Sequence, residues 1–292
     1  MQTVVQSDRS IVLSDGARLA YTLHVPRPGA PPVRKGGRLV LIHSLALDRT
    51  VWDEVVAALG DEAEILTYDC RGHGRSDRRG SDPAGSPAHT PARWGAFTAD
   101  SFARDLAELL DWVGWQKAAI VGCSMGGSVA LAFAGLFPAR TAALGLIDTT
   151  AWYGPDAAAQ FRQRAEAARA KGLSGMIDFQ LTRWFSDAFR SAHPDVLQRL
   201  SAVYVANDFD CYASSCALLG DADLRAHLPA LRMPVGIVVG EEDYATPIEM
   251  ARQLHAAITH STLTVLPKAR HLTPVERPDA IAEMLRGLLG KT

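Results

Sequence analysis

The stretch Ala118-Ala-Ile-Val-Gly-Cys-Ser124-Met-Gly-Gly127 decides how this chain folds. Its first four residues form a continuous apolar run, which is typical of a strand buried on both faces. Glycine at positions 122 and 126 permits a tight turn from this strand into a helical segment at 128–137, with Ser124 at the apex. The pattern predicts a nucleophilic serine whose hydroxyl stands at the carboxyl edge of a sheet.

Other short apolar runs occur on both sides of this stretch and alternate with segments of helical period. Residues 1–25 predict an antiparallel hairpin, because alternating polar and apolar side chains flank a Ser-Asp-Gly turn. The alternation that follows predicts an α/β fold with a mostly parallel, eight-stranded sheet and helices on both faces. The six further strands are expected at 39–42, 65–68, 118–121, 142–147, 235–239 and 263–266.

Two regions interrupt the alternation of strands and helices. Segment 149–229 shows helical patterns and no convincing buried strand, so we expect a helical cap, or lid, inserted into a core formed by 1–148 and 230–292. The polar segment Arg78–Ala96 is rich in Pro and Gly and predicts a long surface loop, as does Pro26–Gly37. The helical patterns in the expected cap cover 156–171, 174–185 and 194–205.

Composition and charge limit the classes of function. The chain has 292 residues, of which 48% are hydrophobic, so it can bury a large core. Its formal net charge of −2 disfavours nucleic-acid binding through a basic surface. The first fifteen residues do not have the pattern of a secretion signal, and no segment approaches the roughly 20 apolar residues of a membrane helix. We therefore expect a cytoplasmic protein with no membrane partner.

Cysteine and ligand patterns favour chemistry that needs no cofactor. Four cysteines in a chain of this length do not make a disulfide framework, although a bridge between Cys211 and Cys216 is an alternative to buried thiols. The sequence has no metal-ligand spacing and no glycine-rich phosphate loop of the dinucleotide type. We expect neither a metal nor a cofactor.

A serine nucleophile needs a base, and the base needs an orienting carboxylate. His271 lies 147 residues after Ser124 and directly follows the last expected strand, so it can reach the same edge of the sheet. Asp243 follows the preceding strand and completes the chain order Ser, Asp, His that such a serine turn predicts. Alternative carboxylates are Glu241, Glu242 and, at the end of the sixth strand, Asp148.

Two backbone N–H groups are expected to form the oxyanion hole. The turn at Ser124 directs the N–H of Met125 toward an acyl group under attack, near the positive end of a helix. Leu45, in the loop His43-Ser-Leu that follows the third strand, supplies the second N–H group. The side chains of His43 and His73 are interpreted as structural.

Together these residues resemble the α/β-hydrolase superfamily over essentially the whole chain. The resemblance implies the fold and the catalytic triad described above. The matching motifs are His43-Ser-Leu, Asp69-x-Arg-Gly-His-Gly-x-Ser76, Gly122-Cys-Ser-Met-Gly-Gly127, Gly240-x-x-Asp243 and His271.

Within the superfamily, segments 183–189 and 211–225 are similar to the lid of the 3-oxoadipate enol-lactonases. Those enzymes hydrolyse a small lactone ring that bears a carboxylate, in the bacterial breakdown of aromatic compounds. The resemblance implies this reaction here, and it places Arg183 and Trp184 at the substrate. Arg183 either pairs with the substrate carboxylate or is a solvated lid residue.

The chain departs from the enol-lactonase pattern after the sixth strand. Asp148-Thr-Thr-Ala-Trp152-Tyr153 stands where those enzymes usually have an Asn-Thr-Ala-Ala type of sequence. Trp152 and Tyr153 either contact the substrate or pack the lid against the core. The substrate is expected to be a small ester or lactone. The alternative functions are a general carboxylesterase, a homoserine-lactone hydrolase, a C–C bond hydrolase, and a receptor-like member of the fold that binds a ligand without turnover.

Overall fold

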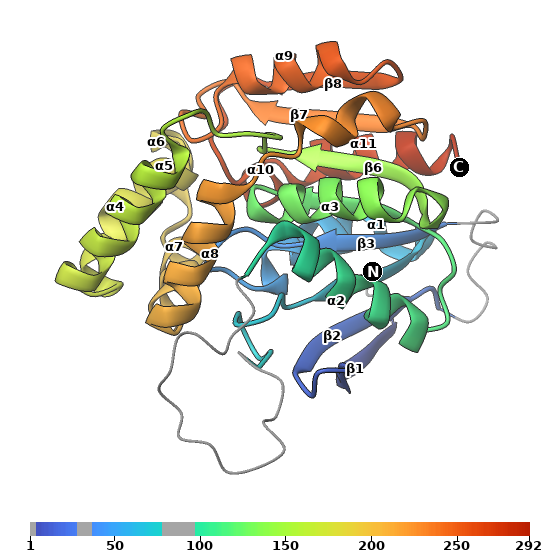
Figure 1. The fold of residues 1–292 in the computed structure, drawn as a ribbon, viewed down its shortest axis with the longest axis horizontal. Coiled ribbons are helices and arrows are strands. Elements are labelled where there is room, and N and C mark those ends of the chain that lie inside the picture. The colour runs from blue at the N-terminus through green and yellow to red at the C-terminus, as the bar shows by residue number, and fades with distance from the viewer. Residues whose placement is uncertain (1–3, 28–36, 78–96) are drawn as a thin grey trace.

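The computed structural model describes residues 4–27, 37–77 and 97–292, which form one eight-stranded sheet with helices around it (Figure 1). The strand order is β1-β2-β4-β3-β5-β6-β7-β8. β2 is antiparallel to both of its neighbours, and all pairs from β4 to β8 are parallel. The strands are β1 (Val4–Val12), β2 (Arg18–Val25), β3 (Arg38–Ile42), β4 (Glu64–Tyr68), β5 (Ala118–Cys123), β6 (Thr141–Ile147), β7 (Val235–Gly240) and β8 (Ser261–Leu266).

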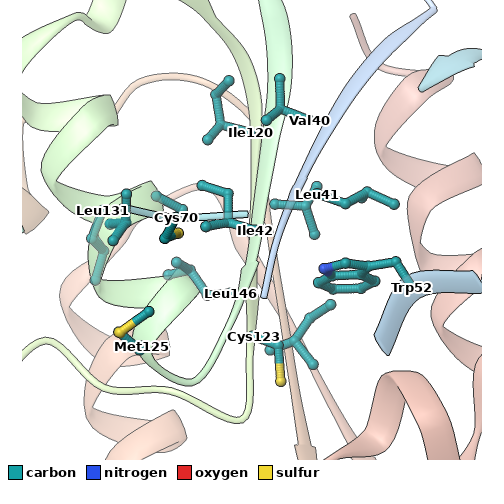
Figure 2. Packing of buried hydrophobic residues seen from close by; sticks show 14 of the residues in the cluster. Val40, Leu41, Ile42, Trp52, Cys70, Ile120, Cys123, Met125, Leu131 and Leu146 are labelled. Atoms are coloured by element: carbon teal, nitrogen blue, oxygen red, sulfur yellow. The ribbon is translucent and has the colours of Figure 1, made fainter. Parts of the chain in front are cut away.

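The central strands are buried on both faces, which explains their continuous apolar sequences. Every residue of β5 and β7 is buried, as are the last four residues of β3. Figure 2 shows Leu41 and Trp52 on one side of the sheet and Ile42 and Leu131 on the other. The expected mostly parallel α/β sheet is therefore confirmed.

Helices cover both faces of the sheet. α3 (Met125–Leu136) lies against β3, β5 and β6, and α2 (Ala99–Trp112) packs over it. α1 (Asp53–Leu59) packs on α11 (Pro278–Leu289) at the opposite face (Figure 1). α9 (Ile248–Ala257) covers β7 and β8, and α10 (Thr273–Glu276) precedes α11. Short 3₁₀ turns occur at Arg49–Trp52, Gly60–Glu62, Pro138–Arg140, Ser174–Met176 and Arg225–Ala230.

α3 begins three residues earlier than its sequence pattern predicts. Helical geometry starts at Met125, directly after Ser124, and includes Gly126 and Gly127. Glycine disfavours a helix, but a side chain at 126 would collide with the backbone carbonyl of Ile42. The close approach of α3 to β3 therefore requires glycine where propensity alone argues against a helix.

The segment between β6 and β7 is helical, and its helices lie at one end of the sheet. Figure 1 shows them beside the end toward which the arrows of β3 and β6 point. The expected helices at 156–171, 174–185 and 194–205 are present. The sequence pattern does not predict the two further helices, at 187–192 and 209–221. The helices are α4 (Ala157–Lys171), α5 (Ile177–Trp184), α6 (Asp187–Ala192), α7 (Pro194–Val205) and α8 (Phe209–Asp221).

Some expectations concern residues that the structure does not describe. The expected loop at Arg78–Ala96 lies outside the described residues, as does most of the loop expected at Pro26–Gly37. Among the described residues, no helix is both long and apolar enough to span a membrane. The four cysteines, all described, are buried thiols, so Cys211 and Cys216 do not form a bridge.

Candidate active site

Ser124 occupies a strained turn between β5 and α3. Its backbone φ of 55° and ψ of −116° lie in a region that residues with a side chain rarely adopt. The turn is so tight that a side chain at Gly122 would collide with the backbone carbonyl of Gly126. Glycine is therefore required in this motif because no side chain fits. The turn holds the Ser124 hydroxyl at the carboxyl end of β5.

Ser124, His271 and Asp243 form a continuous chain of hydrogen bonds. The Ser124 hydroxyl donates to His271 Nε2 across 2.8 Å, and His271 Nδ1–H donates to Asp243 Oδ2 across 2.8 Å. All three residues are at most 5% exposed. They come from three chain segments, after β5, β7 and β8, which meet at one edge of the parallel sheet. The structure thus brings together the three residues expected to form the triad.

Asp243 is held as an ionised acceptor. Its Oδ1 accepts hydrogen bonds from the N–H groups of Ala245 at 2.7 Å and Thr246 at 3.0 Å. Its Oδ2 accepts one from the Thr246 hydroxyl at 2.8 Å, in addition to the His271 bond. Burial by itself raises the pKa of the Asp243 carboxyl, but His271 and these hydrogen bonds outweigh it, so the pKa lies below its usual value.

Asp148 does not bond to His271, although it ends β6 at the same edge. Its Oδ1 accepts from the N–H of Gly240 at 3.2 Å, and its Oδ2 accepts from the N–H and hydroxyl of Thr273 at 2.9 and 2.7 Å. Burial, with the charge of Asp243 as a smaller cause, raises the pKa of Asp148 well above its usual value. Asp148 therefore ties together the loops that carry Asp243 and His271.

The two glutamates beside Asp243 also point elsewhere. Glu241 accepts a hydrogen bond from the N–H of Lys268 at 3.0 Å, and Glu242 pairs with Arg270 at 3.5 Å. Of the alternative carboxylates, none has a hydrogen bond to the histidine within the described part of the chain.

The backbone N–H groups of Leu45 and Met125 are available to an oxyanion. Neither group has a hydrogen-bond acceptor among residues 4–27, 37–77 and 97–292. Met125 is the first residue of α3, where the helix dipole is positive. Leu45 lines the same cavity as Ser124. Both positions therefore fit the expected oxyanion hole.

His43 supports the loop that carries Leu45. Its ring is fully buried, its Nδ1–H donates to the Ser44 carbonyl at 2.8 Å, and its Nε2 accepts from the Cys70 N–H at 2.8 Å. The ring of His73 packs against it at 5.1 Å between centroids. Burial lowers the pKa of both histidines, that of His73 to about 3, which fits neutral, structural rings.

A narrow cavity opens at the hydroxyl of Ser124 and the ring of His271. Tyr153, Arg183 and Trp184, three of the residues considered for substrate binding, lie in its wall. Burial raises the pKa of Tyr153 to about 12, so the hydroxyl remains protonated. The remaining lining residues are Ser44, Leu45, Phe161, Arg164, Leu219 and Ala245.

The structure does not bring Trp152 into this cavity. Its ring lies over the guanidinium of Arg225, 3.7 Å from ring centroid to carbon, and its backbone pairs with Asp223. Arg225 and Asp223 belong to the same segment 149–229 as Trp152, so these two contacts neither reach the cavity nor pack the lid against the core. In contrast, sequence reasoning missed Arg164, because it lies in an α4 sequence rich in Ala, Arg and Gln with no motif and no clear apolar face.

Apolar and aromatic contacts fix the walls of the cavity. Trp184 is 2% exposed and meets Phe185 and Tyr204 edge to face, with ring centroids 6.4 and 5.6 Å apart. Tyr153 meets Phe161 in the same way at 5.1 Å. These contacts hold the large side chains in one arrangement around Ser124.

The end of α5 is joined to the loop that carries His271. The Leu272 N–H donates to the Trp184 carbonyl at 3.1 Å. The guanidinium of Arg270 donates to the carbonyls of Thr182 and Phe185, each at 3.0 Å. Arg183 and Trp184 are therefore held in position by the same loop that carries His271.

Comparison with known proteins agrees with this architecture. The family model for the alpha/beta hydrolase fold matches residues 37–278. 3-Oxoadipate enol-lactonase 2 of Acinetobacter baylyi is 30% identical, over 86% of this chain and 88% of its own length. The crystal structure of the enol-lactonase from Burkholderia xenovorans LB400 has a TM-score of 0.82 and 29% identity, covering 97% of this chain and 100% of that one.

A second solved structure shares the fold at similar identity. It is a thermophilic esterase from Thermogutta terrifontis with malate bound, which has a TM-score of 0.82 and 28% identity and covers 98% of each chain. The resemblance drawn from the sequence motifs is confirmed by the family model and by the enol-lactonase relatives. The chain belongs to the alpha/beta hydrolase fold family.

Proposed function

We propose that the protein is a serine hydrolase that opens a small, carboxylate-bearing lactone, with 3-oxoadipate enol-lactone as its substrate. The observation that carries the proposal is the hydrogen-bonded chain of Ser124, His271 and Asp243, which faces a cavity that also contains Arg183. The enol-lactonase relatives support the choice of substrate. Membership of the family supports hydrolysis in general.

Acylation begins with attack of Ser124 Oγ on the lactone carbonyl. His271 Nε2 accepts the hydroxyl proton, and Asp243 stabilises the imidazolium that forms. The N–H groups of Leu45 and Met125 bind the oxyanion. The tetrahedral intermediate then collapses, the ring C–O bond breaks, and the His271 proton passes to the departing enol oxygen.

Deacylation uses the same groups with water as the nucleophile. Ring opening leaves the former ring oxygen attached to the acyl chain, so no separate alcohol departs. His271 Nε2 removes a proton from water, hydroxide attacks the acyl carbon, and the ester bond to Ser124 breaks as its oxygen regains the proton. The product carries a new carboxylate in place of the lactone carbonyl, and its enol becomes a ketone.

In this proposal, segment 149–229 acts as a cap over a catalytic core formed by 1–148 and 230–292. Tyr153, Arg183 and Trp184 all belong to this segment and line the cavity beside Ser124. The core supplies the reacting groups and the oxyanion hole. The cap therefore determines which acyl group the serine meets.

Arg183 is proposed to hold the carboxylate of the substrate. Its guanidinium has neither a hydrogen bond nor an ion pair within the described residues. Burial, and after it the charge of Arg164, lowers the pKa of Arg183, so the cation is poorly solvated where it stands. An anion would relieve that cost. Malate, the ligand named for the Thermogutta esterase, is itself a carboxylate.

The test compares 3-oxoadipate enol-lactone with neutral p-nitrophenyl esters. We expect a much higher kcat/KM for the lactone, and we expect Arg183→Met to raise KM for the lactone more than for the ester. If neutral esters are preferred and Arg183→Met affects both substrates alike, the lactonase assignment is wrong.

A general carboxylesterase is the second candidate, because the apolar side chains of Trp184, Phe161 and Leu219 also line the cavity. Such a lining would accept an uncharged acyl chain. A preference for neutral esters in the same assay supports this candidate.

A further inference from the structure

The cavity beside Ser124 contains a second cation that no sequence motif indicates. Arg164, from α4, lines it together with Arg183, from α5. We infer that Arg164 is a specificity-determining residue, and that the two guanidinium groups bind a single carboxylate of the substrate. The inference rests on the proposed function and deepens it, because it assigns to Arg164, together with Arg183, the recognition of the substrate's remote carboxylate.

Neutral groups from α5 and α8 hold Arg164 in place. Its Nε donates to the Tyr212 hydroxyl at 3.0 Å, and its Nη2 donates to Gln180 Oε1 at 3.1 Å. Gln180 is itself fixed, because its Nε2 donates to the Tyr204 hydroxyl at 3.2 Å. Gln180, Tyr204 and Tyr212 are at most 1% exposed. The guanidinium is thus oriented by a buried network that leaves its charge uncompensated.

Part of each guanidinium remains available for a ligand. Nη1 of Arg164 has no hydrogen-bond partner among the described residues, and the same holds for all three nitrogens of Arg183. Neither arginine forms an ion pair with an acidic side chain in the described parts of the chain. Two guanidinium groups therefore line one cavity, and no acidic side chain of the described residues neutralises either of them.

Elsewhere the chain neutralises its buried arginines. Arg49 pairs with Asp69, and Arg71 pairs with Asp105 at 2.7 Å, with all four side chains at most 13% exposed. Because an unpaired buried charge is costly, those sites have their counterion built in. The contrast indicates that the counterion of Arg164 and Arg183 is supplied by the ligand.

A carboxylate fits this pair better than an uncharged group. Guanidinium groups bind carboxylates through parallel hydrogen bonds, and two of them can share the two oxygens of one carboxylate. Ser124 and His271 open onto the same cavity, so the bound anion and the attacked carbonyl belong to one small molecule. Hydrolysis then yields a dicarboxylate.

The test uses two esters that differ only in the remote group. Monomethyl adipate carries one ester and one free carboxylate, and dimethyl adipate carries the same ester with the carboxylate masked. We expect the wild-type enzyme to have the higher kcat/KM for the monoester. Arg164→Met should reduce that preference by about 10- to 100-fold, because a hydrogen bond to a charged group is lost on the monoester, and kcat/KM for the diester should fall much less.

Matched variants separate recognition from general effects. Arg162→Met removes the same charge from an exposed position of α4 and should leave the preference unchanged. Arg164→Met combined with Arg183→Met should cost less than the sum of the two single changes, because both residues contact one carboxylate. Tyr212→Phe, which removes only the hydroxyl behind Arg164, should weaken the preference to a smaller extent.

A binding measurement tests the inference without turnover. Ser124→Ala titrated with adipate in a calorimeter should bind it, and Arg164→Met in that background should weaken binding by about 10-fold or more. Equal loss on both esters, equal loss with Arg162→Met, or unchanged adipate binding would overturn the role of Arg164. If the wild type hydrolyses neither ester and not the enol-lactone, the proposed function fails, and the adipate titration still decides whether the arginine site exists.

Discussion

Ser124 shares its positive φ angle with residues that follow two neighbouring strands. Ala46 after β3 and Asp148 after β6 have φ values of 57° and 48°, close to the 55° of Ser124. Such angles cost residues with a side chain on the order of 1 kcal/mol each and persist where the surroundings enforce them. The three lie at the edge of the sheet where the hydrogen-bonded triad assembles.

Removing the serine hydroxyl should abolish most turnover without unfolding the protein. We expect Ser124→Ala to lower kcat by at least about 10³-fold, because only binding and the oxyanion hole then remain. His271→Ala should show a similar loss, and the double variant should be little worse than either. Steady-state kinetics and circular dichroism of the three variants provide the measurement, and near-normal turnover in a folded Ser124→Ala would contradict the role of the serine.

Two aspartates near the histidine allow a direct comparison of roles. Asp243→Asn should lower kcat by about 10⁴-fold, because the amide no longer stabilises the imidazolium of His271. Asp148→Asn should act mainly on stability, since Asp148 bonds to Gly240 and Thr273 and not to the histidine. For both variants, steady-state kinetics measures kcat, and the midpoint of denaturant unfolding measures stability. A mild effect at 243 with a severe one on kcat at 148 would transfer the role of the acid to Asp148.

Residues with a motif could be predicted from the sequence, and residues without one could not. Ser124 lies between required glycines, and Asp243 and His271 follow recognisable strands. Arg164 lies on a helix that is rich in Ala, Arg and Gln, and its hydrogen-bond partners come from α5 and α8. Their meeting depends on how the helices pack, so the sequence carries no local signal for it.

At the scale of elements, the contact between α5 and the His271 loop joins the proposed substrate-binding residues to the proposed catalytic base. Arg270 donates to two carbonyls at the end of α5, next to Arg183 and Trp184. Such donors satisfy backbone groups that a helix end leaves open. The positions of Arg183 and Trp184 therefore depend on a residue adjacent to His271.

Arg270→Met should loosen this contact. We expect a loss of about 1–3 kcal/mol in the free energy of unfolding, and a rise in KM for a carboxylate-bearing substrate that exceeds the change in kcat. Urea denaturation and steady-state kinetics measure the two effects. Arg252→Met, at a side chain that is 65% exposed on α9, is the control and should change neither quantity. A normal KM together with normal stability would show that the contact is dispensable.

The elements were predicted best where burial alone determines them. The strands at 118–123 and 235–240 are buried on both faces, so their apolar runs mark them clearly. α8 was not singled out, although its first turn is capped by the Asp208 side chain, which accepts from the Cys211 N–H at 3.0 Å. Its sequence mixes Ser, Cys, Gly and Asp, because it packs on α4 and not on the sheet. Helix-on-helix contacts leave a weaker pattern than a buried sheet does.

At the scale of the whole molecule, buried histidines should make the fold sensitive to mild acid. Burial lowers the pKa of His24 to about 4 and that of His73 to about 3. In the unfolded chain the histidine pKa values are about 6.5. Between about pH 6.5 and pH 4 the unfolded chain therefore binds more protons than the folded chain, so the free energy of unfolding decreases as pH falls from about 6.5 to about 4. Each such histidine contributes up to about 1.4 kcal/mol per pH unit in that window.

Thermal unfolding between pH 4 and 7 measures this effect. His24→Gln should reduce the fall in Tm across the window, because a neutral amide replaces the titrating ring. His260→Gln, at an exposed position, is the control and should leave the fall unchanged. Parallel Tm curves for the wild type and His24→Gln would show that His24 does not cause the acid sensitivity.

The five helices α4 to α8 leave the sheet at the end of β6 and return to it at the start of β7, and these two strands are hydrogen-bonded neighbours. Both ends of this inserted helical segment are thus attached to adjacent strands of one sheet. Lengthening, shortening or exchanging it leaves the order of all eight strands intact. Under the proposed function, replacing one continuous piece of the gene would change the acyl preference, while Ser124, His271 and Asp243 are inherited unchanged.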